Sequence, residues 1–212
     1  MKTLVIHPYD PSTDFLAEIY KGKDWTVMTG PFHKATVARM IKTHDRVIML
    51  GHGTPNGLIG NGGFVIDYKT AALLRNKKEC VFIWCHADDY VKLHELSGFF
   101  TGMIISEMSE AQSNRVKCIA ADVVESNALF AAAVAEGIDL PQQELLNTVK
   151  TLYWSNTNPV IQYNAERVFA GKCSWGFPRA IVFGHPVRAK SEYAMEVQVQ
   201  EQVEDFPMDL FN

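Results

Sequence analysis

The chain has 212 residues, of which 47% are hydrophobic, and it carries a formal net charge of −4 at a pI of about 6.0. This length and composition can bury one sizeable core, so we expect a single domain over residues 1–212. No Lys/Arg-rich face stands out, which argues against a nucleic-acid partner. The apolar runs are too short to cross a bilayer, and the first fifteen residues lack the apolar core of a secretory signal. We therefore expect a cytoplasmic protein with no membrane partner, and the oligomeric state stays open.

The first half of the chain alternates short apolar runs, typical of strands, with amphipathic segments, typical of helices. In chain order the predicted elements are strand Thr3–His7, helix Ser12–Tyr20, strand Trp25–Met28, helix His33–Thr43, strand Arg46–Leu50, helix Tyr68–Lys78, strand Cys80–Trp84, helix Asp89–Phe100 and strand Gly102–Ser106. Ser12 or Thr13 is the expected N-cap of the first helix. The Gly62-Gly63 pair predicts a small hairpin between the third strand and the next helix.

The second half is mostly helical. Ala120–Gly137 predicts a long helix that ends at a glycine, and Pro141–Trp154 predicts another. A third helix is expected over Asn158–Gly171, because Asn158 is a good cap and Pro159 suits the first helical position. Arg179–Gly184 predicts a sixth strand. The tail over residues 191–212 has six acidic residues and no lysine or arginine, so we expect a solvated face with part of it as an edge strand.

This alternation predicts the fold class. Strands that are apolar on both faces are typical of a parallel sheet covered by helices on each side. We therefore expect a three-layer α/β sandwich with a mostly parallel sheet of about six strands.

Two polar side chains follow neighbouring predicted strands. His52 comes after the strand Arg46–Leu50, between two glycines, and Cys85 comes directly after the strand Cys80–Trp84. Loops that leave the carboxyl ends of parallel strands share one edge of the sheet, which is where such folds place their sites. If the two strands are neighbours they lie ~4.8 Å apart, so both side chains could face one substrate.

The residues around this pair suit nucleophilic chemistry. Gly51 and Gly53 remove bulk beside the imidazole and let the backbone approach a ligand. The N–H groups of Gly53 and Cys85 could form an oxyanion hole. Cys85 also precedes a predicted helix, whose first turn favours a thiolate, although Asp88 and Asp89 in that turn oppose it.

An apolar strand ending in His-Gly, followed by an apolar strand ending in Cys, resembles the caspase-like (clan CD) cysteine peptidases. The resemblance covers roughly residues 46–112, and Cys85 comes 33 positions after His52. It implies a caspase-like fold, a catalytic His52-Cys85 dyad, a peptide or protein substrate and no cofactor. It also implies that Ser106 and Glu107 border the pocket for the residue before the cleaved bond, so cleavage after a basic residue is expected.

One departure supports an alternative function. The family usually has a small residue before the nucleophile, and this chain has Trp84, which could occupy substrate space and is our third candidate for substrate binding. The alternative is a catalytically silent caspase-like module that binds a partner protein through its acidic tail and a sheet edge.

Other side chains have a weaker claim to a site. His7 ends a predicted strand, and His86 and His185 follow predicted strands, but each is better explained as a structural or solvated residue, and Trp175 as packing. Cys80, Cys118 and Cys173 fit buried apolar positions, and the four cysteines form no disulfide framework or zinc pair. The glycine-rich segment lacks a phosphate-binding fingerprint, there is no G-x-S-x-G, and no ligand spacing supports a metal.

Overall fold

The computed structural model describes residues 1–60, 62–154 and 156–172, which belong to one compact unit of the chain. The predicted strand Arg179–Gly184 and the acidic tail lie outside the described residues, as do Cys173, Trp175 and His185. Within the described ranges no helix is both long enough and apolar enough to cross a membrane.

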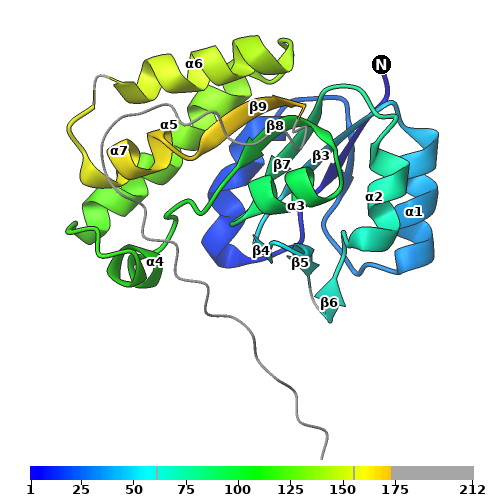
Figure 1. The fold of residues 1–212 in the computed structure, drawn as a ribbon, viewed down its shortest axis with the longest axis horizontal. Coiled ribbons are helices and arrows are strands. Elements are labelled where there is room, and N and C mark those ends of the chain that lie inside the picture. Colours follow the sequence, from blue (N-terminus) through cyan, green and yellow to red (C-terminus); the bar gives the residue numbers. More distant parts are fainter. Residues whose placement is uncertain (61, 155, 173–212) are drawn as a thin grey trace, which may run out of the picture. The chain divides into compact units, whose positions relative to one another are not determined.

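A six-stranded sheet forms the centre of the fold (Figure 1). Its strands, in spatial order, are β2 (Thr26–Met28), β1 (Thr3–Ile6), β3 (Arg46–Leu50), β7 (Cys80–Ile83), β8 (Ser97–Thr101) and β9 (Val168–Lys172). The first five are parallel, and β9 pairs antiparallel with β8. A small antiparallel sheet follows β3 and consists of β4 (Gly53–Thr54), β5 (Gly57–Gly60) and β6 (Gly63–Phe64). The expected hairpin is therefore confirmed as the pairing of β5 with β6.

Helices cover both faces of the large sheet, which confirms the expected three-layer α/β architecture (Figure 1). The helices are η1 (Pro11–Tyr20, a 3₁₀ helix), α1 (Lys34–Thr43), α2 (Tyr68–Leu74), α3 (Ala87–Leu93), α4 (Met108–Ser113), α5 (Ala120–Gly137), α6 (Gln142–Trp154) and α7 (Pro159–Ala165). One hydrophobic core lies between the sheet and α1, α2 and α3, and the other lies between the sheet and η1, α5 and α6. Alternation along β1 decides which side chain enters which core: Leu4 and Ile6 face the first, and Val5 faces the second.

The fifth strand lies five residues earlier than the sequence predicts. Gly102–Ser106 is not a strand, and the helix expected over Asp89–Phe100 ends at Leu93, because the segment from Ser97 forms β8. Phe99 and Phe100 enter opposite cores, which is the period of a strand and not of a helix. Gly98 permits the pairing, since a Cβ there would lie 2.3 Å from the carbonyl oxygen of Cys80.

The helix predicted over Asn158–Gly171 is half right. The Asn158 side chain accepts hydrogen bonds from the N–H groups of Val160 and Ile161, so the cap is confirmed, but α7 ends at Ala165. The remainder forms β9, whose Phe169 stacks on Phe100 of β8 with ring centroids 5.7 Å apart. The sheet described here thus gains its antiparallel edge strand from a segment that the sequence pattern assigns to a helix.

The first helix begins earlier than expected. Asp10 is its N-cap, in place of Ser12 or Thr13, and the Asp10 carboxylate accepts the N–H of Ser12 at 3.0 Å. Pro11 occupies the first helical position, where its fixed φ suits a helix and its missing N–H costs nothing. With the cap moved to Asp10, the Ser12 hydroxyl lies in the first turn and donates to the Asp10 carboxylate.

Candidate functional site

His52 and Cys85 follow adjacent parallel strands, as the sequence predicts. Leu50 of β3 is paired with Ile83 of β7, and the N–H of Gly51 continues the ladder to the Ile83 carbonyl at 3.0 Å. His52 and Cys85 each lie two residues beyond this last pair. Figure 1 shows the strands that follow His52, β4 and β5, at the lower edge of the sheet. Both residues therefore belong to the carboxyl edge of the same sheet.

The glycines around His52 have separate structural reasons. Gly51 has a φ of +134°, a conformation that favours glycine. Gly53 lies directly against the indole of Trp84, where a Cβ would come within 2.1 Å of Cδ1. The Trp84 Nε1–H also donates to the carbonyl oxygen of Thr54 at 3.2 Å. The segment that carries His52 is thus fastened to the residue that precedes Cys85.

This packing corrects the expected role of Trp84 in substrate binding. Its side chain is only 1% exposed, and its ring makes edge-to-face contacts with Tyr90 and Phe82. Its backbone is also held, because Thr101 accepts the Trp84 N–H and donates its hydroxyl to the Trp84 carbonyl. An indole so enclosed cannot contact a substrate in this conformation. It packs against Gly53 and so supports the segment that carries His52.

His52 is bonded to Ser12, which the sequence suggested only as a helix cap. Its Nε2 lies 2.6 Å from the Ser12 Oγ, and the same Oγ donates to the Asp10 carboxylate at 2.7 Å. The hydroxyl and N–H of Ser12 lower the pKa of Asp10 below its usual value, because both stabilise the carboxylate. Three groups from the end of β1 and the end of β3 therefore form one polar chain.

Cys85 is bonded to a different set of groups. Its Sγ lies 3.5 Å from the Ile104 carbonyl oxygen and 3.5 Å from Glu110 Oε1. Burial, and then the charge of Glu110, raise the pKa of the Cys85 thiol to about 12. The expectation of a thiolate favoured by the helix start is therefore wrong for this conformation, in which Cys85 is a neutral thiol. Among the described residues, no hydrogen bond joins Cys85 to His52, and the Cys85 backbone N–H has no acceptor.

Glu110 brings Ser106 and Glu107 toward Cys85. Its Oε2 accepts the Ser106 N–H at 2.7 Å, the Ser106 hydroxyl at 3.0 Å and the Glu107 N–H at 3.1 Å. Because β8 ends at Thr101, Ser106 and Glu107 do not sit at a strand end as expected. They sit at the start of α4, and one carboxylate connects that start to the thiol.

The loop between β8 and α4 is fixed from the helical layer. Asn164 of α7 accepts the Ile105 N–H at 2.7 Å and donates to the Ile105 carbonyl at 2.9 Å. Asn127 of α5 donates to the Ser106 carbonyl at 2.9 Å. These side chains bond to backbone groups that a neighbouring strand would otherwise satisfy. They thereby fix the loop in which the Ile104 carbonyl meets the Cys85 thiol.

No family model, no curated protein and no solved structure matches this chain. Any assignment of function therefore depends on the residues and the geometry described above.

His7 and His86 fit structural explanations. His7 is 3% exposed and contacts the Tyr20 hydroxyl and Thr13 Oγ1, and burial lowers its pKa. His86 has a left-handed φ of +66° and lies 3.5 Å from Asp89. Among the described residues His86, Asp88 and Asp89 could present ligand atoms within 4.8 Å of one another. However, Lys92 already pairs with both carboxylates, at 2.6 and 3.9 Å, so the group is explained without a metal.

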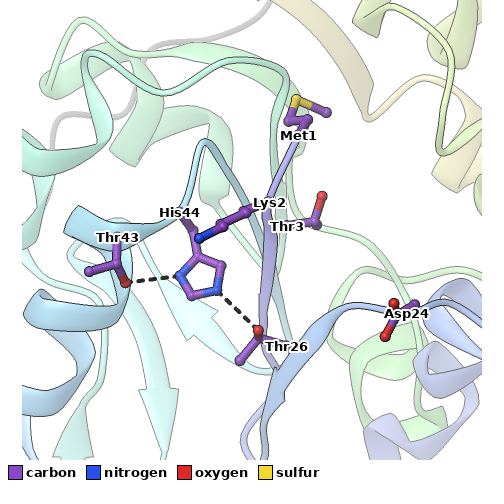
Figure 2. A pocket seen from close by; sticks show the side chains of 7 residues that line it. All are labelled: Met1, Lys2, Thr3, Asp24, Thr26, Thr43 and His44. Atoms are coloured by element: carbon purple, nitrogen blue, oxygen red, sulfur yellow. Dashed lines mark hydrogen bonds between the residues drawn. The ribbon is translucent and has the colours of Figure 1, made fainter.

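A cavity of about 380 Å³ lies at the other edge of the sheet (Figure 2). It is lined by Met1, Lys2, Thr3, Asp24, Thr26, Thr43 and His44, from the amino ends of β1, β2 and β3. Figure 2 shows the His44 ring bonded to Thr43 and Thr26, which leaves neither ring nitrogen free for chemistry. Because parallel α/β folds place their sites at the carboxyl edge, we assign this cavity no part in the site.

Sequence reasoning missed Asp10, Thr101 and Asn164, and it considered Ser12 only as a helix cap and Glu110 only as a second carboxylate beside Glu107. Only the Asp-Pro-Ser order gave a usable signal, since Asp before Pro is a common helix start. The others lie far from His52 and Cys85 in the sequence, so only the fold brings them to the site.

Proposed function

We propose that this protein is a cysteine endopeptidase of the caspase-like type, with His52 and Cys85 as its catalytic dyad. The observation that carries the proposal is the register of β3 and β7, which puts a His-Gly segment and a cysteine at equivalent positions beyond two adjacent parallel strands. The bond from Trp84 to Thr54 supports it, because it fastens the two segments to each other.

In the proposed reaction, His52 accepts the proton of the Cys85 thiol and the sulfur attacks the carbonyl carbon of the scissile peptide bond. The N–H groups of Cys85 and Gly53 donate to the oxyanion of the tetrahedral intermediate. When the C–N bond breaks, His52 returns the proton to the leaving amine. His52 then takes a proton from the water that attacks the thioester, and it returns this proton to the Cys85 sulfur when the C–S bond breaks. Every proton is accounted for without a cofactor.

The resting thiol must move before this reaction starts. Cys85 Sγ is held by Glu110 and the Ile104 carbonyl, and a thiol with a pKa of about 12 is almost wholly protonated at neutral pH. We propose that a bound substrate displaces the thiol from these acceptors toward His52. The enzyme would then be slow toward small electrophiles and fast toward peptide-like ones.

Substrate selection is proposed to involve Ser106 and Glu107 at the start of α4. A carboxylate partly shielded from water attracts a cationic side chain, and Arg can bind it through two hydrogen bonds. The proposal is therefore cleavage after a basic residue, with Glu107 as the selector.

A catalytically silent binding module is the second candidate. The observation that favours it is the environment of Cys85, whose thiol is bonded to a carboxylate and a carbonyl in place of a base. In that case the partner would be a protein that contacts a sheet edge or the acidic tail.

One experiment separates the two functions. The full chain is incubated with peptidyl electrophiles that carry different residues at the position before the warhead, and the intact mass is measured. A single addition that maps to Cys85 and is lost in His52→Ala supports the peptidase. No addition from any probe, in a protein that is folded by circular dichroism, supports the silent module.

A further inference from the structure

The polar chain from Asp10 through Ser12 to His52 can be analysed by counting its protons. Ser12 has one hydroxyl proton, and the Asp10 carboxylate, which can only accept, takes it at 2.7 Å. The backbone N–H of Ser12 donates to the same carboxylate oxygen at 3.0 Å, which fixes the position of Ser12. The Ser12 Oγ is then left as an acceptor for the third group, the Nε2 of His52 at 2.6 Å.

This count determines the tautomer of His52. An acceptor at 2.6 Å from Nε2 requires the proton of a neutral imidazole to be on Nε2, which leaves Nδ1 without one. We propose that Asp10 and Ser12 are positioning residues that hold His52 as its Nε2–H tautomer, so that Nδ1 is the nitrogen that accepts the thiol proton. The catalytic consequence rests on the proposed function, whereas the tautomer is a property of the folded chain alone.

The local fold makes this support rigid. Asp10 caps η1, and its carbonyl oxygen also accepts the hydroxyl of buried Thr13 at 3.1 Å. Leu16 and Ile19 anchor the helix in the core, with exposed fractions of 2% and 0%. Ser12 is therefore presented to His52 from a fixed turn, and a histidine orienter works only if its own position is fixed.

The same arrangement places a carboxylate near the imidazole. The Asp10 Oδ1 lies 3.9 Å from His52 Nε2, so it faces the positive charge that the proposed reaction places on the ring. Asp10 would stay ionised, because its own pKa lies below the usual value. The Ser12 oxygen thus lies between the Asp10 carboxylate and the His52 imidazole and keeps the two groups from bonding directly.

The test measures the tautomer without any substrate. The full chain is labelled with ¹⁵N-histidine, and long-range ¹H–¹⁵N correlations are recorded at about pH 8.5, where a histidine side chain is neutral. The His52 signals are assigned by their loss in His52→Gln. We expect the Nε2–H pattern for His52 in the wild type and in Ser12→Thr, which keeps the hydroxyl. In Ser12→Ala the pattern should shift toward a mixture of both tautomers.

Asp10→Ala gives an independent expectation. Without the carboxylate, the Ser12 hydroxyl is free to donate to Nε2, so His52 should shift toward the Nδ1–H tautomer. Ser113→Ala is the matched control, since Ser113 is exposed, donates to a local acceptor near a helix end and forms no hydrogen bond with Asp10, Ser12 or His52. The proposal is overturned by an Nδ1–H pattern in the wild type, or by a pattern that neither Ser12→Ala nor Asp10→Ala alters.

A kinetic arm separates this inference from the proposed function. On a cleaved peptide, Ser12→Ala should lower kcat by roughly tenfold or more with little change in KM, and Ser12→Thr should restore most of it. A normal kcat in Ser12→Ala would overturn the positioning role. If no peptide is cleaved by the wild type but the tautomer behaves as expected, the peptidase proposal fails and the assignment of the Asp10-Ser12-His52 chain stands.

Discussion

The Cys85 thiol lies 3.5 Å from the Glu110 carboxylate, and this contact acts with burial to keep the candidate nucleophile protonated. Burial raises the thiol pKa first, the charge of Glu110 raises it further, and its hydrogen bond acts in the same direction. Glu110 is itself held by the N–H groups of Ser106 and Glu107, so it cannot easily turn away. The Glu110 carboxylate, in the first turn of α4, thus lowers the reactivity of the Cys85 thiol by keeping it protonated.

Replacing Glu110 by Gln should make Cys85 more reactive. The variant keeps the size of the side chain and removes the charge, so the thiol pKa should fall from about 12. At a fixed neutral pH the thiolate fraction rises about tenfold for each unit of pKa lost, and the alkylation rate rises about threefold, because a less basic thiolate is also a weaker nucleophile. The measurement is the rate of iodoacetamide labelling of Cys85 by peptide mapping.

The partly exposed Cys118 is the internal reference for this measurement, because burial and Asp122 raise its pKa while Glu110 does not act on it, so its rate should not change. An unchanged or lower rate at Cys85 in Glu110→Gln would contradict the role of the carboxylate.

Gly53→Ala should destabilise the fold and disturb the site together. The new methyl group would lie 2.1 Å from Trp84 Cδ1 and 2.7 Å from the Gly57 carbonyl oxygen, so the indole or the His52 segment must move. Overpacking of this kind costs about 1–3 kcal/mol of unfolding free energy. Urea denaturation of the variant provides the measurement. Gly102→Ala is the control, because its Cβ would meet Phe169 at an ordinary 3.5 Å. Equal stabilities of the two variants would argue against the close contact.

Asn164→Ala should release the loop that faces Cys85. The substitution leaves the buried N–H and carbonyl of Ile105 without partners, which costs about 1–3 kcal/mol for each unsatisfied group. We expect lower stability in urea and faster hydrogen exchange at Ile105. Asn147→Ala, on the exposed face of α6, should change neither. Unchanged exchange at Ile105 would show that the asparagine does not hold the loop.

Alkaline pH should weaken the fold through Cys80. Burial raises the pKa of this thiol from its ordinary 9.0 to about 12. Above pH 9 the unfolded chain loses the thiol proton while the folded chain keeps it, so the unfolding free energy falls as pH rises toward 12. One such group contributes a slope of about 1.4 kcal/mol per pH unit. Urea unfolding at several pH values should give a shallower alkaline decline for Cys80→Ala, and parallel curves would contradict the assignment.

Hydrophobic patterning was enough to predict the central fold. The strand Arg46–Leu50 and the helix Ala120–Gly137 have the bounds that the sequence indicated, because buried runs and caps are local signals. Local signals failed where tertiary pairing decides. Ser97–Thr101 is a strand because Gly98 lets two backbones approach, and Val168–Lys172 is a strand because β8 offers it a free edge.

The candidate site divides in the same way. His52 and Cys85 could be found because each follows an apolar strand in the sequence. The contacts that Glu110 and Ser12 make with them could not be predicted, since the first reaches Cys85 across 25 residues and the second reaches His52 across 40. Their roles depend on which strand ends the sheet brings together, and no pattern along the chain carries that information.

The final prediction concerns the residue before the cleaved bond. Ser106 and Glu107 directly precede α4 and lie beside the Glu110 carboxylate that contacts Cys85. The Glu110 Oε2 already accepts three hydrogen bonds, so the Glu107 carboxylate is better placed to bind a substrate cation. We expect faster cleavage of fluorogenic peptides with Arg or Lys at this position than of those with Ala, Asn or Asp. Glu107→Gln should remove most of the preference through KM for the basic peptides, while cleavage of the Ala peptide stays unchanged. A basic preference that persists in Glu107→Gln would assign the selection to another group. Equal rates of cleavage of all five peptides by the wild-type protein would exclude selection by charge.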